Sequence, residues 1–265
     1  MQMTLKHMDI ALESAAEALA AGDKVPARFK AIWKTARGDE DRLGILAARS
    51  QLLDYLAACH ILGDTKRYSD ACDLLLEQSV NFAERFHPAS EMLLVELSLA
   101  LISKRRPLVR VLAKVILKRE ESGCKTLESF QARSLAALLD LDYSAVQDIA
   151  AALTKACEGK AFDKLTCSQG MLWAIAVQQL ANGDGKEAER VLQELQQQHV
   201  CNTDRELAKL KRGGASAFGP FDILDLPAAA LFSLIEDIGH AVQPISEAAC
   251  ACGYALGLRP ARAED

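Results

Sequence analysis

The chain has 265 residues, half of them apolar and only 5% aromatic, with a formal net charge of −5. This mild acidity argues against a protein that binds nucleic acid through an overall positive charge. No apolar run approaches the roughly 18 residues that a membrane span requires, so we expect no nucleic-acid and no membrane partner.

The amino-terminal segment does not have the pattern of a secretory signal peptide, because Asp9, Glu13 and Glu17 interrupt its apolar residues. Most of the eight cysteines lie in apolar helical contexts, where a reduced thiol behaves as a small hydrophobic group. We therefore expect a soluble cytoplasmic protein in a reducing compartment.

Gly-Asp pairs mark predicted junctions between helices along the chain. They stand at 22–23, 38–39, 63–64 and 183–184. Glycine ends a helix in the left-handed conformation, and the aspartate that follows caps the next helix. The pairs at 22–23, 63–64 and 183–184 form a first series with further turn signals near Pro107, at 139–145 and at 219–227. The spacing within this series is about 40 residues. A second series of breaks lies between them, at Gly38, His87-Pro88, Gly123, Gly159, Cys201-Asn202 and Gln243-Pro244.

The segments on the two sides of the first-series turns have different patterns. Segments 43–62, 91–102 and 170–181 are apolar on nearly every face, which predicts buried helices. Segment 185–198 instead has one apolar stripe, as in an amphipathic helix. We therefore predict an all-α single domain over residues 1–265, an array of about six antiparallel helical hairpins stacked as in TPR or HEAT proteins. Residues 200–227 are predicted to form an irregular connection within it. The hairpins are either true sequence repeats or the ordinary pairs of any antiparallel helical domain.

Two pairs of residues in the sequence are of types that can bind a metal ion. Cys250 and Cys252 lack the usual Cys-x₂-Cys spacing, so packing in the core is the simpler interpretation. Glu236 and His240 are four residues apart, which allows half a metal site or an ion pair on a helix surface. We predict no metal and no cofactor.

Catalytic motifs are also missing from the sequence. There is no nucleophile elbow, Walker loop or dinucleotide fingerprint, so we predict no catalytic residue and not an enzyme. The remaining alternative is an enzyme that uses the loop at 200–220, which includes the glycine-rich segment 211–216. Its titratable groups would be His199, Lys209, Lys211 and Arg212.

Charge is distributed unevenly along the chain. Residues 101–119 contain seven lysines and arginines and no acid. Arg106, Arg110, Lys114 and Lys118 are spaced by four residues, so they are predicted to form a basic ridge on one helix. The ridge is an ordinary solvated face, a contact for a phosphate-bearing or acidic partner, or a membrane-surface contact.

Acidic clusters and one tryptophan complete the candidate binding residues. Acids at 39–41 either cap a helix or contact a partner, and a second acidic pair stands at 236–237. Trp33 is either a core residue or an interface anchor. The candidate partner-binding residues are thus Trp33, Asp39, Glu40, Asp41, Arg106, Arg110, Lys114, Glu236 and Asp237.

Two segments carry a resemblance to a known family. The run W-A-x-A-x-Q-x-L-x-x-G-D-x-x-x-A from Trp173 to Ala188 and the segment FDILDLPAAALFSLIEDIGH at 221–240 resemble bacterial immunity proteins of polymorphic toxin systems. The nearest type is the all-helical immunity protein 49. The resemblance implies an antidote that binds a cognate protein toxin and occludes its active site. A helical-repeat scaffold or regulator that binds a peptide or protein is the alternative.

Overall fold

The computed structural model describes residues 5–22, 24–36, 38–119, 125–159, 161–213, 218–243 and 245–256, and the side chains of Ala21 and Asp39 lie outside this description. These ranges form twelve α-helices and two 3-10 helices without a strand, which confirms the all-α prediction. No helix found in them is long and apolar enough to cross a membrane.

The chain divides into two compact units built from interleaved segments, where the sequence predicted one domain. The first unit comprises Met1–His87, His199–Asp225 and Ser246–Gly253. The second comprises Pro88–Gln198, Leu226–Ile245 and Tyr254–Asp265. Neither unit is therefore a continuous stretch of sequence.

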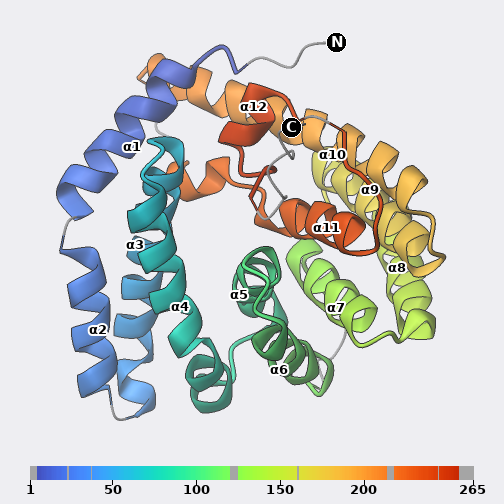
Figure 1. The fold of residues 1–265 in the computed structure, drawn as a ribbon, viewed down its shortest axis with the longest axis horizontal. Helices are drawn as coiled ribbons and strands as arrows, with labels where there is room; N and C mark the ends of the chain where they lie inside the picture. The colour runs from blue at the N-terminus through green and yellow to red at the C-terminus, as the bar shows by residue number, and fades with distance from the viewer. Residues whose placement is uncertain are drawn as a thin grey trace, which may run out of the picture. The chain divides into compact units, whose positions relative to one another are not determined.

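The first unit is organised around helix α3. Its helices are α1 (Met8–Gly22), α2 (Val25–Thr35), α3 (Arg42–Ile61), α4 (Thr65–Phe86) and α12 (Glu247–Ala251), with 3-10 helices η1 (Asp39–Asp41) and η2 (Pro220–Ile223). Helix α3 packs against α1, α2, α4 and η2 (Figure 1). Buried side chains on several of its faces, such as Leu52, Leu53 and Ala58, confirm that this apolar segment is a buried helix.

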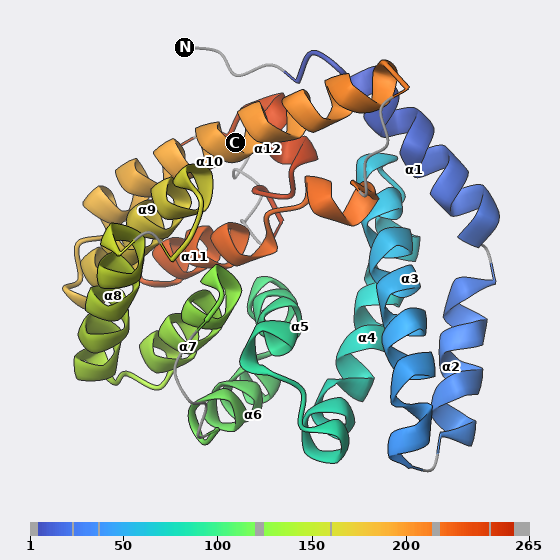
Figure 2. The ribbon, with the colours of Figure 1, turned by 180° about the vertical axis from the view of Figure 1, so that it is seen from behind.

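The second unit is a succession of neighbouring helices. They are α5 (Ser90–Ile102), α6 (Arg106–Leu117), α7 (Leu127–Leu139), α8 (Tyr143–Glu158), α9 (Lys164–Ala181) and α11 (Leu226–Asp237). From α5 to α9 each helix packs against the next, and α5 also contacts α7 and α11 (Figure 2). Trp173 of α9 is fully buried, and its indole N–H donates to the Ser134 hydroxyl at 2.9 Å. A buried indole with its donor satisfied is a core residue.

Helix α10 (Gly185–Lys211) corrects the prediction of an irregular segment over 200–227. The predicted break at Cys201-Asn202 lies inside this helix. Residues 200–211, the first part of the segment predicted to be irregular, are helical. The reason is that the buried stripe of the amphipathic half continues through Val200, Thr203 and Leu207. Burial of these side chains outweighs the weak helix propensity of the local Cys-Asn-Thr run.

Four helix junctions share one backbone conformation. Gly63, Lys104, Leu141 and Gly183 have φ values of 73°, 55°, 60° and 78°. In each turn the next N–H reaches back to the preceding helix, as Asp142 N–H does to the Ala137 carbonyl at 3.0 Å. This is the Schellman ending of a helix. The four junctions lie where the first series of turn signals predicted them, while the six-hairpin array remains a prediction.

The aspartates after three of these turns cap the following helices. The carboxylates of Asp64, Asp142 and Asp184 each accept a hydrogen bond from a backbone N–H three residues on, at 3.0 Å. This is the capping role predicted for the Gly-Asp pairs at 63–64 and 183–184. The pair at 22–23 includes Asp23, which lies outside the described residues, as does Gly123.

Candidate functional site

The predicted basic ridge lies along the exposed face of α6. Pro107 is in the first turn of this helix, where its missing N–H costs nothing. The opposite face buries Val109, Leu112, Ala113 and Ile116. This stripe holds α6 in one orientation, so the side of the helix that faces solvent is determined by packing.

All four side chains of the ridge are exposed, namely Arg106, Arg110, Lys114 and Lys118. Within the described part of the chain none of them forms an ion pair or side-chain hydrogen bond. Val111, next to Arg110, is 42% exposed and adds an apolar group to the same surface. The ridge therefore presents fixed positive charge that no described side chain neutralises.

The acidic residues at 39–41 have a local structural role. They form η1, which leads directly into α3. The Asp41 carboxylate accepts a hydrogen bond from the Gly38 N–H at 3.4 Å, and Glu40 is exposed. The acids thus stand at a helix start as predicted, but Asp41, the N-cap residue of α3, forms no side-chain capping hydrogen bond with that helix.

Asp237 is engaged by a lysine of the same unit. The Lys104 ammonium lies 2.9 Å from the Asp237 carboxylate and donates to the Ser233 hydroxyl at 2.6 Å. The Asp237 side chain is only 19% exposed, and Glu236 beside it is half-buried. This acid thus stabilises the second unit, and its charge is already compensated.

His240 pairs with a residue other than the one expected. Helix α11 ends at Asp237, and Gly239 with φ 88° turns the chain, so His240 does not share a helical face with Glu236. Its Nε2 lies 2.8 Å from the carboxylate of Glu189, which also accepts the Gln243 N–H at 2.7 Å. The predicted pair Glu236–His240 is therefore wrong. Among the residues that the structure describes, no three His, Cys, Asp or Glu side chains gather as metal ligands would.

Trp33 belongs to an aromatic cluster of the first unit. Its ring meets Phe29 and Phe86 edge-to-face, with centroids 6.2 and 5.9 Å away. The residue is half-buried, and its indole N–H is buried without a hydrogen-bond partner in the described chain. These ring contacts agree with the interpretation of Trp33 as a core residue, and its role as an interface anchor stays a prediction.

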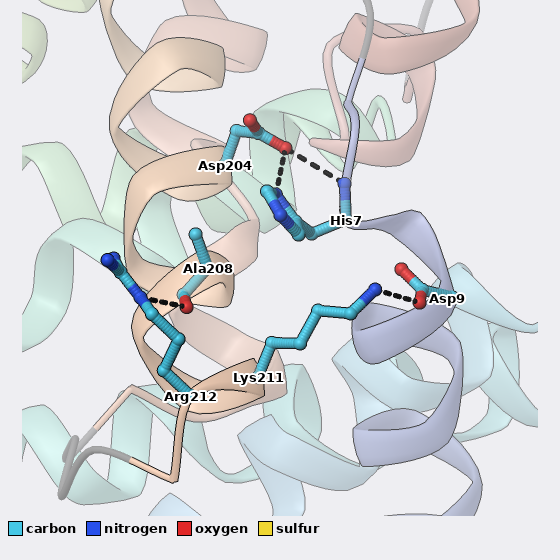
Figure 3. Close-up of polar contacts among 6 residues, drawn as sticks. All are labelled: His7, Asp9, Asp204, Ala208, Lys211 and Arg212. Carbon is cyan, nitrogen blue, oxygen red and sulfur yellow. Dashed lines mark hydrogen bonds and ion pairs between the residues drawn. The ribbon is translucent and has the colours of Figure 1, made fainter.

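The groups near the end of α10 do not converge on a common point (Figure 3). Lys211 pairs with Asp9 at 2.9 Å, while the Arg212 guanidinium donates to the Ala208 carbonyl of its own helix at 3.0 Å. Lys209 pairs with Glu206, and the His199 Nε2 lies 2.9 Å from the Ile223 carbonyl. These titratable groups thus contact separate partners, and residues 214–216 of the glycine-rich segment lie outside the description.

Sequence reasoning overlooked two residues that organise the second unit, Lys104 and Glu189. A signal for Lys104 was present, since it occupies the turn position that glycine holds at Gly63. A signal for Glu189 was its place beside Ala188 in the apolar stripe of α10, where a buried acid requires partners. Neither signal indicates which residue pairs with Lys104 or with Glu189.

Comparison with known proteins adds no relative: no family model, curated protein or solved structure matches this chain.

Proposed function

We propose that this protein binds an acidic surface of a partner protein through the basic ridge of α6. The partner proposed is a cognate bacterial toxin, whose active site the bound protein occludes. The observation that carries the proposal is the set of four exposed cations at regular spacing along α6 and its C-cap, which pair with no side chain in the described part of the chain.

The acidic candidates support this choice of surface by contrast. Asp237 and Asp41 already accept bonds from their own units, so binding a partner would require those contacts to break. The ridge has no such cost among the described residues. An arginine side chain can also donate two parallel hydrogen bonds to one carboxylate, which favours Arg106 and Arg110 as specific contacts.

Electrostatic complementarity suits the proposed task. A charged ridge accelerates encounter with an oppositely charged partner and disfavours wrong partners. Val111 supplies an exposed apolar group on the same helix, and apolar contacts are usual in protein interfaces. The resemblance of the Trp173–Ala188 and 221–240 segments to immunity proteins supports a toxin as the partner.

The test uses the product of a toxin-like gene, which the proposal expects to lie next to the gene for this protein. Co-expression should restore growth of cells that make the toxin, and the purified proteins should form a complex. Changing Arg106, Arg110 and Lys114 together to glutamate should weaken this complex about 100-fold or more, mainly through a slower association rate that depends on salt.

A matched control keeps the charge change and moves its position. Lys155, Lys164 and Lys186 are exposed cations of the same unit, and changing them to glutamate should alter the affinity by only a few-fold. Equal weakening by both triple variants would contradict the proposal for the ridge. A stronger effect of Glu40→Lys than of the ridge variant would assign binding to the acidic cluster, and failure to rescue growth would contradict the immunity function itself.

A further inference from the structure

A cavity of about 500 Å³ lies in the first unit among α1, α2 and α3. Its size is typical of small-molecule sites. The residues around it include both charges and an apolar wall, the latter formed by Ala18, Val25 and the ring of Tyr55. It is independent of the ridge, which belongs to the second unit, and of the function proposed for the ridge.

Positive charge enters the cavity from the start of α2. Lys24 and Arg28 both line it, and they are four residues apart, which places them on one side of the chain. Both are exposed, and neither forms an ion pair with a described residue. The Arg28 guanidinium donates a long hydrogen bond of 3.4 Å to the Gln51 amide oxygen.

Negative charge enters from α3, at Asp54. This carboxylate is half-buried and accepts the Phe221 N–H at 3.4 Å, with no cation among the described residues paired to it. Burial raises the pKa of Asp54, and the nearby Asp222 raises it further, against the Phe221 hydrogen bond. A carboxylate in this environment would be stabilised by a cation brought by a ligand.

The two charges lie at neighbouring positions of α3, at Gln51 and at Asp54. Gln51 and Asp54 are three residues apart on α3, so their side chains leave the helix about 5–6 Å from each other. Arg28 is held at Gln51, and Asp54 lies one turn further along, with the cavity beside them. The cavity wall thus carries an arginine, Arg28, and an aspartate, Asp54, that form no ion pair with each other.

We propose that this cavity binds a free amino acid with an apolar side chain. The ammonium group of the ligand would lie beside Asp54, and its carboxylate beside Arg28 and Lys24. The side chain would contact Tyr55 and Val25. A single ligand of this class matches the apolar wall and both charges, which form no ion pair with a residue that the structure describes, whereas a simple anion or a simple amine matches only one charge.

Calorimetric titration of the full chain at neutral pH tests the site with three probes that share one ring. L-phenylalanine has both charges, phenethylamine lacks the carboxylate and N-acetyl-L-phenylalanine lacks the ammonium. L-phenylalanine should bind at least about tenfold more tightly than either analogue, a difference of about 1.4 kcal/mol. No binding of L-phenylalanine up to about 10 mM, or equal binding of all three probes, would overturn the proposal.

Two variants assign the charges. Asp54→Asn should weaken binding of L-phenylalanine and abolish its preference over the N-acetyl analogue. The double variant Lys24→Gln/Arg28→Gln should abolish its preference over phenethylamine. Lys34→Gln, an exposed cation of α2 outside the cavity, should change nothing. Because the readout is a change of preference between probes, a general loss of stability cannot imitate it. Preferences that persist in both variants would show that the ligand binds elsewhere.

Discussion

The ammonium of Lys104 lies 2.9 Å from the carboxylate of Asp237, although 133 residues separate them along the chain. Lys104 is the left-handed residue of the turn between α5 and α6, and Asp237 is the last residue of α11. The same ammonium bonds Ser233, so one side chain ties a turn to a helix within the second unit. A residue type that usually points into solvent is here part of the framework.

Removing the negative charge of Asp237 should therefore destabilise the protein. We expect Asp237→Asn to lower the free energy of unfolding by about 1 kcal/mol, the scale for a partly exposed charged hydrogen bond. Asp148→Asn, at an exposed position of α8 without a described partner, should change it by less than about 0.5 kcal/mol. Urea unfolding followed by circular dichroism measures both, and equal stability of the two variants would contradict the structural role of Asp237.

The left-handed turns allow a stabilising substitution. Leu141 has φ 60° and is 69% exposed, so Leu141→Gly removes backbone strain at the cost of few contacts. We expect a gain of about 1 kcal/mol in unfolding free energy. Gly183→Ala is the reverse change at an equivalent turn. It should cost about 1 kcal/mol through backbone strain alone, since an added Cβ meets no atom within 4 Å and therefore causes no clash. Thermal unfolding should show shifts of opposite sign, and a fall in melting temperature for Leu141→Gly would show that the leucine side chain matters more than the strain.

Glu189 should be the most sensitive acid of α10. It is 4% exposed and accepts bonds from Gln243 N–H and from a histidine ring, so Glu189→Gln keeps its shape while removing the charge-assisted pair. A loss of about 2 kcal/mol is expected. Glu194→Gln breaks only the solvent-exposed pair with Arg190 on the same helix and should cost less than about 0.5 kcal/mol. Chemical denaturation of both variants compares the two, and losses of similar size would show that burial does not strengthen the Glu189 contacts.

Alkaline pH should weaken the protein through Cys252. Burial, with the charge of Asp225, raises the pKa of this fully buried thiol from its usual value near 9 to about 12. Between these values the unfolded chain loses a proton that the folded chain keeps, so stability is intact below pH 9 and falls as pH rises, by about 1.4 kcal/mol per pH unit. Cys252→Ala should remove this share of the slope, and Cys201→Ala, at an exposed position, should not. Unfolding curves at pH 8, 9 and 10 give the slopes, and identical slopes for wild type and Cys252→Ala would contradict the raised pKa.

The sequence predicted where the helix junctions lie, but not which residues adopt the left-handed conformation in them. Gly63 and Gly183 announce left-handed turns because glycine adopts that conformation without a penalty. Lys104 and Leu141 adopt the same conformation, yet their residue types give no such signal. Their turns were located from spacing, Pro107 and neighbouring aspartates. The extent of α10 was underestimated because burial, which is a tertiary effect, decides whether a weakly helical stretch remains helical.

The candidate site shows the same division between local and distant information. The basic ridge follows from a four-residue spacing within one helix, and its exposure follows from the buried stripe opposite. The partners of Asp237 and His240 could not be inferred, because each lies more than 50 residues away in the sequence. An acid that has no partner nearby in the sequence is therefore a weaker candidate for partner binding than a cation whose exposure follows from the pattern of its own helix.

The interleaving of the two units has a consequence for synthesis on the ribosome. Helices α1 to α4 emerge first, but their packing partners within the first unit, His199–Asp225 and Ser246–Gly253, emerge only after all of Pro88–Gln198. Until then the nascent chain exposes apolar surface that the finished protein buries, which makes this interval the one most open to aggregation. Translation pauses or chaperone contacts would protect the chain most effectively in the interval before Gly253 is made.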